Sequence, residues 1–77
     1  MPALKNKRLD VRPLLARGED PRLAVDTALT TLHPGQGLTV VAPFLPSPLI
    51  ERLKATGFSA RAERRTDGSW SVDFVRD

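Results

Sequence analysis

The chain has 77 residues, with 12 lysines and arginines against 9 aspartates and glutamates, and it contains no cysteine. A chain this short forms a single domain, and without cysteine it has no disulfide, thiolate metal site, iron–sulfur cluster or cysteine nucleophile. The net charge of +3 is concentrated between Lys5 and Arg12, so the remainder is neutral. We expect a flexible basic arm at 1–8, one domain at 9–77, and a cytoplasmic protein without membrane association.

The first half of the chain predicts one strand and one helix. Apolar and charged residues alternate over Leu9–Arg12, which predicts a short strand ended by Pro13. The segment 14–19 has no periodicity and is predicted to be a loop. Asp20 and Pro21 then suit the N-cap and first position of a helix. The apolar stripe of this helix consists of Val25, Ala28, Leu29 and Leu32.

The second half predicts a strand, a helix and a hairpin. The run 38–42 is β-branched and apolar, as in a central strand. Ser47 is predicted to cap a helix with Pro48 at its first position, and Gly57 to end it. Two alternating runs, 58–63 and 70–74, are joined by Asp67-Gly68, which is a strong hairpin signal.

The predicted order is therefore β-α-β-α-β-β. Because each helix shows one apolar stripe, both helices should cover one face of a four-stranded mixed sheet, which makes an α/β (α+β) two-layer sandwich. The other face has a mixed composition, and the pattern leaves open whether water or a second subunit meets it. Its predicted members are Thr39, Val41, Ser59, Arg61, Glu63, Ser71, Asp73 and Val75.

The residues that could carry chemistry are few. His33 is the only histidine, and its place at the end of the first predicted helix suits C-terminal capping, with a ligand or proton-handling role as the alternative. Gly35-Gln36-Gly37 precedes a strand, so a turn is favoured over a phosphate loop. Phe58, Trp70 and Phe74 share the parity of the core. We therefore expect no catalytic, metal or cofactor-binding residues, no cofactor and no enzyme activity.

Two clusters are candidates for contact with a ligand or partner. Asp10, Arg12 and Arg17 flank the end of the first predicted strand, where arginine forks could bind a carboxylate or phosphate, or could form local ion pairs. Phe44 and Leu45 lie in a loop with three prolines. They could fold back onto the following helix as a hydrophobic staple, or remain exposed as an apolar contact for a partner.

Several segments resemble known families. The first half resembles the TusA-like (SirA-like) sulfur-carrier proteins, whose order is β-α-β-α-β-β, through 9–12, 32–36 and 38–41. The second half is similar to the bacterial domain-of-unknown-function family 2249 through 43–49, 57–58 and 67–70. The resemblance covers about 9–76 and implies the same two-layer fold.

The resemblance also has consequences for chemistry. Sulfur carriers begin their first helix with Cys-Pro-x-Pro, whose cysteine carries the persulfide, whereas the corresponding stretch here is 15–21 and only Pro21 matches. Without the thiol, persulfide chemistry is excluded. Some members of the family 2249 lie beside or are fused to hemerythrin-like domains, which implies a link to redox or nitrogen-oxide metabolism.

We therefore expect a small non-catalytic binding or adaptor module that contacts another protein through Asp10, Arg12, Arg17 and Phe44, as a monomer or weak homodimer. One alternative is a binding protein for a small anion or metabolite, linked to redox or sulfur and nitrogen-oxide metabolism, which uses Arg17 and the amides at 20–21. The second is weak nucleic-acid binding through the basic N-terminal arm, because the four cations between Lys5 and Arg12 could neutralise only a few phosphates.

Overall fold

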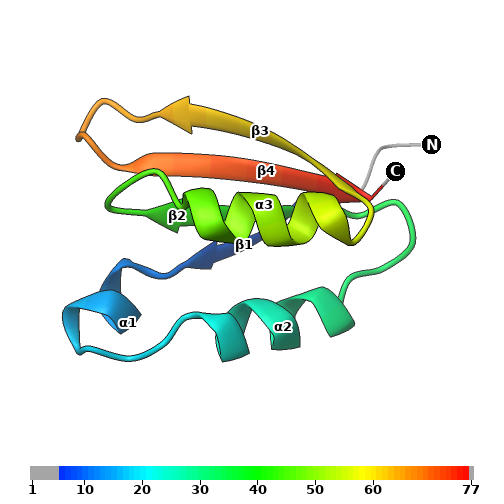
Figure 1. Cartoon of the computed structure of the whole chain (residues 1–77), viewed down its shortest axis with the longest axis horizontal. Coiled ribbons are helices and arrows are strands. Elements are labelled where there is room, and N and C mark those ends of the chain that lie inside the picture. Colours follow the sequence, from blue (N-terminus) through cyan, green and yellow to red (C-terminus); the bar gives the residue numbers. More distant parts are fainter. Residues whose placement is uncertain (1–5, 77) are drawn as a thin grey trace.

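The computed structural model describes residues 6–76 and places seven elements around one sheet (Figure 1). In chain order they are β1 (Lys7–Asp10), α1 (Arg12–Ala16), α2 (Arg22–Thr30), β2 (Leu38–Ala42), α3 (Ser47–Ala55), β3 (Phe58–Arg64) and β4 (Trp70–Arg76). The strand order is β1-β2-β4-β3; β1 runs parallel to β2, and the other pairs are antiparallel. The predicted four-stranded mixed sheet and the hairpin are confirmed.

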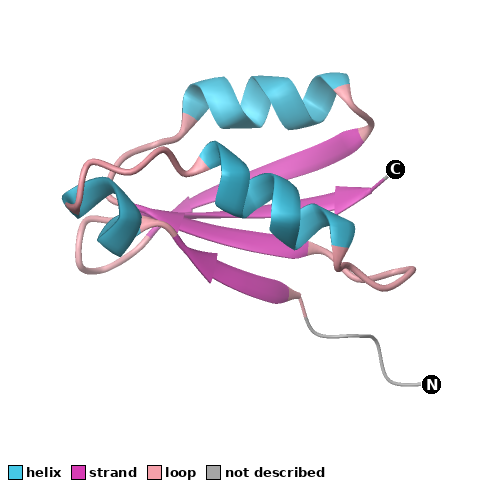
Figure 2. Cartoon of the chain, turned by 90° about the horizontal axis from the view of Figure 1, so that it is seen from below, coloured by secondary structure: helices cyan, strands magenta, loops and turns pink. Residues whose placement is uncertain are grey.

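The two longer helices, α2 and α3, lie on the same face of the sheet (Figure 2). Alternate strand residues point to that face and pack against one apolar side of each helix. The two-layer sandwich is therefore confirmed. Its buried core consists of Val11, Val25, Ala28, Leu38, Val40, Ala42, Leu53, Phe58, Val72 and Phe74.

A polar row crosses the opposite face of the sheet. Arg8, Thr39, Asp73 and Arg61 are register partners on β1, β2, β4 and β3. The Thr39 hydroxyl donates to Oδ1 of Asp73 at 2.7 Å and accepts from Nδ2 of Asn6 at 3.2 Å. Side-chain hydrogen bonds thus connect neighbouring residues at the centre of this face, which α2 and α3 leave uncovered (Figure 2).

Helix α1 corrects two predictions, because 14–16 of the predicted loop 14–19 are helical and the first strand ends at Asp10 rather than at residue 12. Oδ1 of Asp10 accepts a hydrogen bond from the Arg12 amide at 3.0 Å, which turns the chain out of β1. Pro13 follows in the first turn of α1, where a missing amide costs nothing. Pro13 therefore belongs to the start of a helix and does not end the strand, which already finishes at Asp10.

A Schellman motif ends α1. Gly18 adopts a φ of +74°, and its amide donates to the Leu15 carbonyl at 3.0 Å. The Glu19 amide donates to the Leu14 carbonyl at 2.9 Å. These two bonds supply donors to carbonyls of the last turn, which stabilises a helix of only five residues.

The predicted caps have different outcomes. Oδ1 of Asp20 accepts from the Arg22 amide at 2.9 Å, but α2 begins at Arg22 with Pro21 at its N-cap and no side-chain cap, so the predicted start of this helix lies one residue too early. The Ser47 prediction is wrong: α3 begins at Ser47 itself and no side chain caps it. Instead Pro46 (φ −82°, ψ 67°) occupies an inverse γ-turn, in which the Ser47 amide donates to the Leu45 carbonyl at 2.9 Å.

The N-terminal arm overlaps the sheet. Lys7 and Arg8 belong to β1, and Nζ of Lys7 donates to the Thr31 hydroxyl at 2.6 Å. The rest of the predicted arm, 1–5, lies outside the described residues. Between residues 6 and 76, no helix has the length and apolar character needed to cross a bilayer.

Candidate functional site

One end of the sheet gathers the segments that the sequence singled out. The parallel strands β1 and β2 finish there, and α1, the loop 43–46 and the β3–β4 turn lie at the same end (left in Figure 1). Ligands of α/β proteins commonly bind beyond the carboxyl ends of parallel strands. This end is therefore the place to look for a site.

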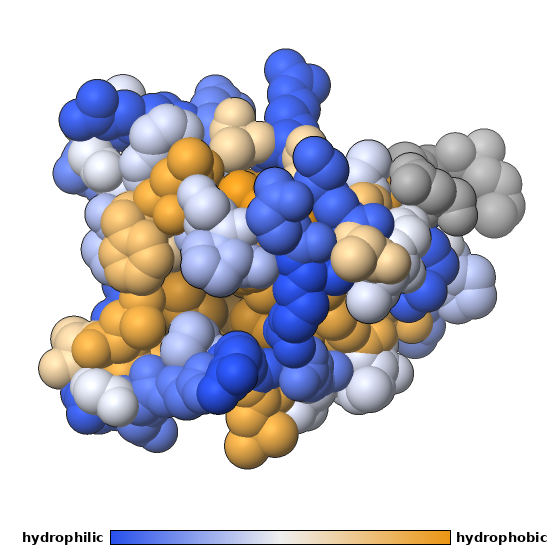
Figure 3. Space-filling model, in the orientation of Figure 1, coloured by the Kyte–Doolittle hydropathy of each residue, from blue (hydrophilic) through white to orange (hydrophobic). Residues whose placement is uncertain are grey.

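A pocket of about 320 Å³ opens there between α2 and α3. Figure 3 shows the corresponding hydrophobic surface in the hollow between the two helices. Apart from two arginines, Arg22 and Arg52, every lining residue is apolar. The apolar lining consists of Val11, Leu15, Pro21, Val25, Val40, Ala42, Phe44, Pro46, Pro48 and Leu49.

The loop between β2 and α3 forms one wall of the pocket. Phe44 belongs to this wall and is 54% exposed, and its neighbour Leu45 is 40% exposed. Buried Pro46 holds the loop through its γ-turn. The arrangement favours the exposed alternative for this loop over a staple folded onto the following helix.

Arg22 stands at the start of α2 and is held by one carboxylate. Its Nε and Nη2 donate to Oδ2 of Asp20 at 2.9 and 2.7 Å. This side-chain hydrogen bonding lowers the pKa of Asp20 and raises that of Arg22. The guanidinium of Arg22 is thus largely committed within the chain.

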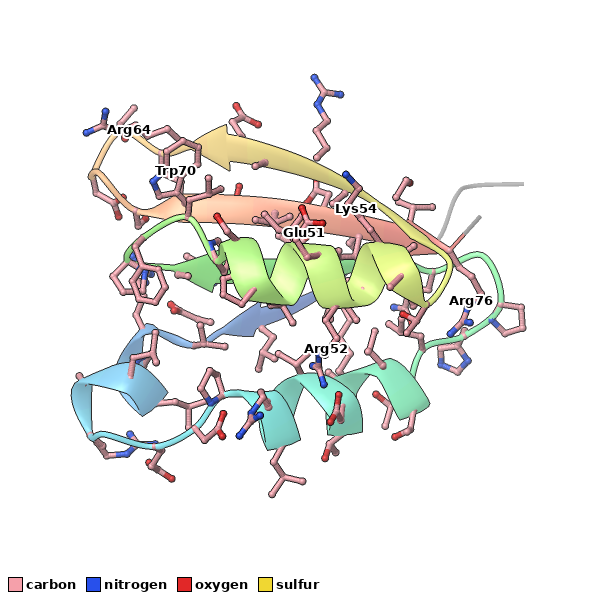
Figure 4. All side chains as sticks on the ribbon, viewed as in Figure 1. Glu51, Arg52, Lys54, Arg64, Trp70 and Arg76 are labelled. Carbon is pink, nitrogen blue, oxygen red and sulfur yellow. The ribbon has the colours of Figure 1, made fainter. Side chains whose placement is uncertain are left out.

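Arg52 is held less completely. Its side chain points from α3 toward α2, whereas Glu51 and Lys54 leave the helix on the opposite side (Figure 4). Nη2 of Arg52 lies 3.1 Å from Oδ1 of Asp26, an ion-pair distance, but the N–H direction does not make a hydrogen bond. Although the side chain is 39% exposed, this nitrogen is buried, and within 6–76 it lacks a hydrogen-bond partner.

Asp10 and Arg12 form a separate ion cluster. Nη2 of Arg12 lies 2.6 Å from Oδ2 of Asp10, and Nη1 lies 3.1 Å from Oδ2 of Asp67 in the hairpin turn. The hydrogen bond from Arg12 lowers the pKa of Asp10. Neither residue lines the pocket. The cluster is the local ion pairing that the sequence left open as an alternative, extended to a third residue.

Arg17 lies apart from both groups. Its Nε is 2.5 Å from Oε2 of Glu19, and its side chain is 60% exposed. It does not line the pocket, and the amide of Arg22 is already bonded to Asp20. Of the four predicted surface residues, the structure therefore joins Asp10 to Arg12 and places Phe44 at the pocket, but it leaves Arg17 in its own loop.

His33 lies three residues beyond α2, so the predicted capping of that helix by its side chain is wrong. Its amide donates to Oε1 of Gln36 at 3.0 Å within the turn. His33 lines a second cavity of about 460 Å³ at the opposite end of the sheet, together with Val75 and Arg76. Within 6–76 no group of three or more histidines and carboxylates is placed to hold a metal.

The sequence carried a signal for the two pocket arginines that the prediction missed. Arg52 follows Leu49 by three residues, so it shares the side of α3 on which Leu49 lies. Arg22 likewise precedes Val25 by three residues on α2. An arginine on the apolar face of a helix indicates either an ion pair with a nearby carboxylate or a polar group in the wall of a pocket.

Comparison with known proteins gives one family. No curated protein and no solved structure matches the chain. The family described as "Uncharacterized conserved protein (DUF2249)" matches residues 8–76, nearly the whole of the described chain. This confirms the resemblance to the family 2249, and the chain therefore belongs to the DUF2249 family.

Proposed function

We propose that the protein is a non-catalytic binding module of the TusA-like fold that takes an apolar group into the pocket between α2 and α3. The observation that carries the proposal is the lining of this pocket, in which two arginines are the only polar side chains. Binding pockets combine apolar walls with a few polar groups that orient the ligand. The pocket has this composition.

The size of the pocket suits a small ligand. Its volume of about 320 Å³ lies at the lower end of the range for small-molecule sites, roughly 300–1,000 Å³. A dry cavity of about 150 Å³ holds one benzene ring. A body of roughly one to two rings, or an alkyl chain of comparable volume, therefore fits between the helices.

Three features support a role without catalysis. The chain has no cysteine, so the persulfide chemistry of sulfur carriers is excluded. Pro21, the position that resembles the carrier motif, is part of the pocket wall. The two carboxylates nearest the pocket arginines, Asp20 and Asp26, are each paired with one of them. The link to redox or sulfur and nitrogen-oxide metabolism and the cytoplasmic location stay predictions.

A titration with octanamide, a neutral amphiphile, tests the pocket. We expect methyl resonances of Val25 and Leu49 to shift in a saturable way, because both side chains line it. Leu49→Trp should fill the space and abolish binding. Leu23→Trp is the matched control, since Leu23 is 76% exposed on α2 and does not line the pocket. Equal binding by both folded variants would contradict the proposal.

A protein-binding adaptor is the second candidate function. It is favoured by the exposure of Phe44 and Leu45, two large apolar side chains on one rigid loop. The test is calorimetric titration with the protein encoded by the adjacent gene. Phe44→Ser with Leu45→Ser should weaken binding at least tenfold, and Leu23→Ser should leave it unchanged. Undiminished affinity in the double variant would reject this loop as the contact.

A further inference from the structure

We propose that the ligand of the interhelical pocket is a small monocarboxylate, with its apolar body between α2 and α3 and its carboxylate bound by Arg52. This inference rests on the proposed function and names the class of ligand. We argue it from the charges of the residues that line the pocket and from the missing hydrogen bond of Nη2 of Arg52.

The charged side chains that line the pocket are all positive. Arg22 and Arg52 are part of the lining, whereas their partners Asp20 and Asp26 are not. A ligand inside the pocket therefore meets apolar walls and guanidinium groups. Such a lining favours an apolar molecule with one anionic end over a neutral or cationic one.

The two arginines differ in what they can still bind. Arg22 already donates twice to Asp20. Arg52 holds Asp26 only at ion-pair distance, and its buried Nη2 has no hydrogen bond within 6–76. A buried donor without an acceptor is unfavourable, and this cost is removed when the guanidinium turns from Asp26 toward an incoming oxygen. Arg52 is therefore the residue that would bind the head group.

The geometry favours a carboxylate as that head group. A carboxylate presents two coplanar oxygens that match the planar guanidinium fork. A phosphate would bring a larger charge and three terminal oxygens, whereas only one nitrogen of Arg52, the buried Nη2, is identified as lacking an acceptor. An apolar body with a single carboxylate thus satisfies the walls and Nη2 together.

Asp26 would compete with the bound carboxylate for Arg52, because it already lies at ion-pair distance from that side chain. Its side chain is 54% exposed, and it accepts no hydrogen bond from the Arg52 nitrogen that it faces. A bound carboxylate would take over Arg52, while Asp26 stays in contact with water. Removal of the negative charge at position 26 should therefore strengthen binding of the ligand.

Three probes with the same alkyl chain and different head groups test the inference: octanoate, octanamide and octyl phosphate, titrated at pH 7 by calorimetry and methyl NMR. We expect octanoate to bind roughly ten- to a hundredfold more tightly than octanamide, the ratio for a charge-assisted hydrogen bond. Octyl phosphate should bind more weakly than octanoate.

Variants then assign the preference to Arg52. Arg52→Met keeps an apolar stem and should bring octanoate down to the affinity of octanamide, with octanamide binding retained as evidence of an intact pocket. Arg61→Met is the matched control, because Arg61 lies on the other face of the sheet opposite Asp73. Asp26→Asn should raise octanoate affinity roughly threefold or more and leave octanamide unchanged.

The outcomes separate the two proposals. Equal affinities for octanoate and octanamide in the unmodified protein, or a preference that survives Arg52→Met, would overturn the carboxylate assignment and leave the pocket as a binding site. Tighter binding of octyl phosphate, or weaker octanoate binding in Asp26→Asn, would also overturn it. If neither octanoate nor octanamide binds, the proposed function itself fails.

Discussion

Arg12 and Asp67 are 55 residues apart in the sequence, and Nη1 of Arg12 donates to Oδ2 of Asp67 at 3.1 Å. The contact joins the first turn of α1 to the turn of the β3–β4 hairpin. Because Arg12 also chelates Asp10, one guanidinium connects β1, α1 and the hairpin turn. The cluster that the sequence suggested for partner contact thus has a structural role at the end of the sheet.

Arg12→Met should lower the thermal unfolding midpoint and speed amide exchange in the turn 65–69, since it removes both carboxylate contacts at once. Arg17→Met is the control. The Arg17–Glu19 pair is exposed on both sides, so its loss should change the free energy of unfolding by no more than about 0.5 kcal/mol. Equal destabilisation by the two substitutions would contradict a linking role for Arg12.

Acid should weaken the fold through Asp67. Hydrogen bonds from the Ser69 hydroxyl, at 2.5 Å, and from its amide, at 2.9 Å, lower the pKa of Asp67 to about 2. The unfolded value is about 3.9. Since the folded pKa is the lower one, Asp67 stabilises the protein above pH 4, and this contribution is lost as the pH falls from about 4 to about 2. Urea unfolding of Asp67→Asn should therefore show a shallower loss of stability across that range.

Gly37→Ala should be more costly than Gly18→Ala, although Gly18 has the positive φ. A Cβ at position 37 would lie 2.7 Å from the Phe74 carbonyl oxygen and 2.7 Å from Oδ1 of Asn6, whereas a Cβ at position 18 meets nothing within 4 Å. We expect a loss of about 1–3 kcal/mol for Gly37→Ala from overpacking. The Gly18 variant should lose about 1 kcal/mol from backbone strain. Urea titrations of both variants measure the difference, and the reverse order would contradict the close approach at Gly37.

The two phenylalanines at 44 and 74 should respond oppositely to truncation. Phe74 is fully buried between the sheet and the helices, so Phe74→Ala should cost about 3–5 kcal/mol. A small domain has a stability near the low end of the range of about 5–15 kcal/mol, so this variant should be largely unfolded by circular dichroism. Phe44→Ala should remain folded because the side chain is 54% exposed. A folded Phe74→Ala variant would contradict the central role of Phe74 in the hydrophobic core.

The sequence predicted the elements with clear periodicity and missed the one that local hydrogen bonds define. The stripes of α2 and α3 and the Asp67-Gly68 hairpin are visible in single segments. Helix α1 has only five residues and no repeat, and it depends on the Asp10 side chain at its start and on Gly18 at its end. The sequence signals for α1 are Asp10, three residues before Pro13, and Gly18, five residues after Pro13.

The pocket could be predicted only in part. The proline-rich loop around Phe44 predicts a contact residue, and Phe44 does line the wall of the pocket. The position of Arg17 near Asp20 in the sequence predicts a shared site, but Arg17 follows the end of α1 in a Schellman turn and does not line the pocket. The pocket itself depends on the spacing of two helices that carry Val25 and Leu49, and such a distance is set by tertiary packing rather than by either segment.

The strand order makes β1 and β3 the two edge strands of the sheet. A border strand offers unpaired backbone groups to other chains, and charged residues on it oppose such pairing. On β1, Lys7 and Arg8 are adjacent, and on β3 the charges are Arg61, Glu63 and Arg64. A copy of either strand added in parallel register would place like charges opposite one another. The sheet is thus protected at both borders against growth into fibrils.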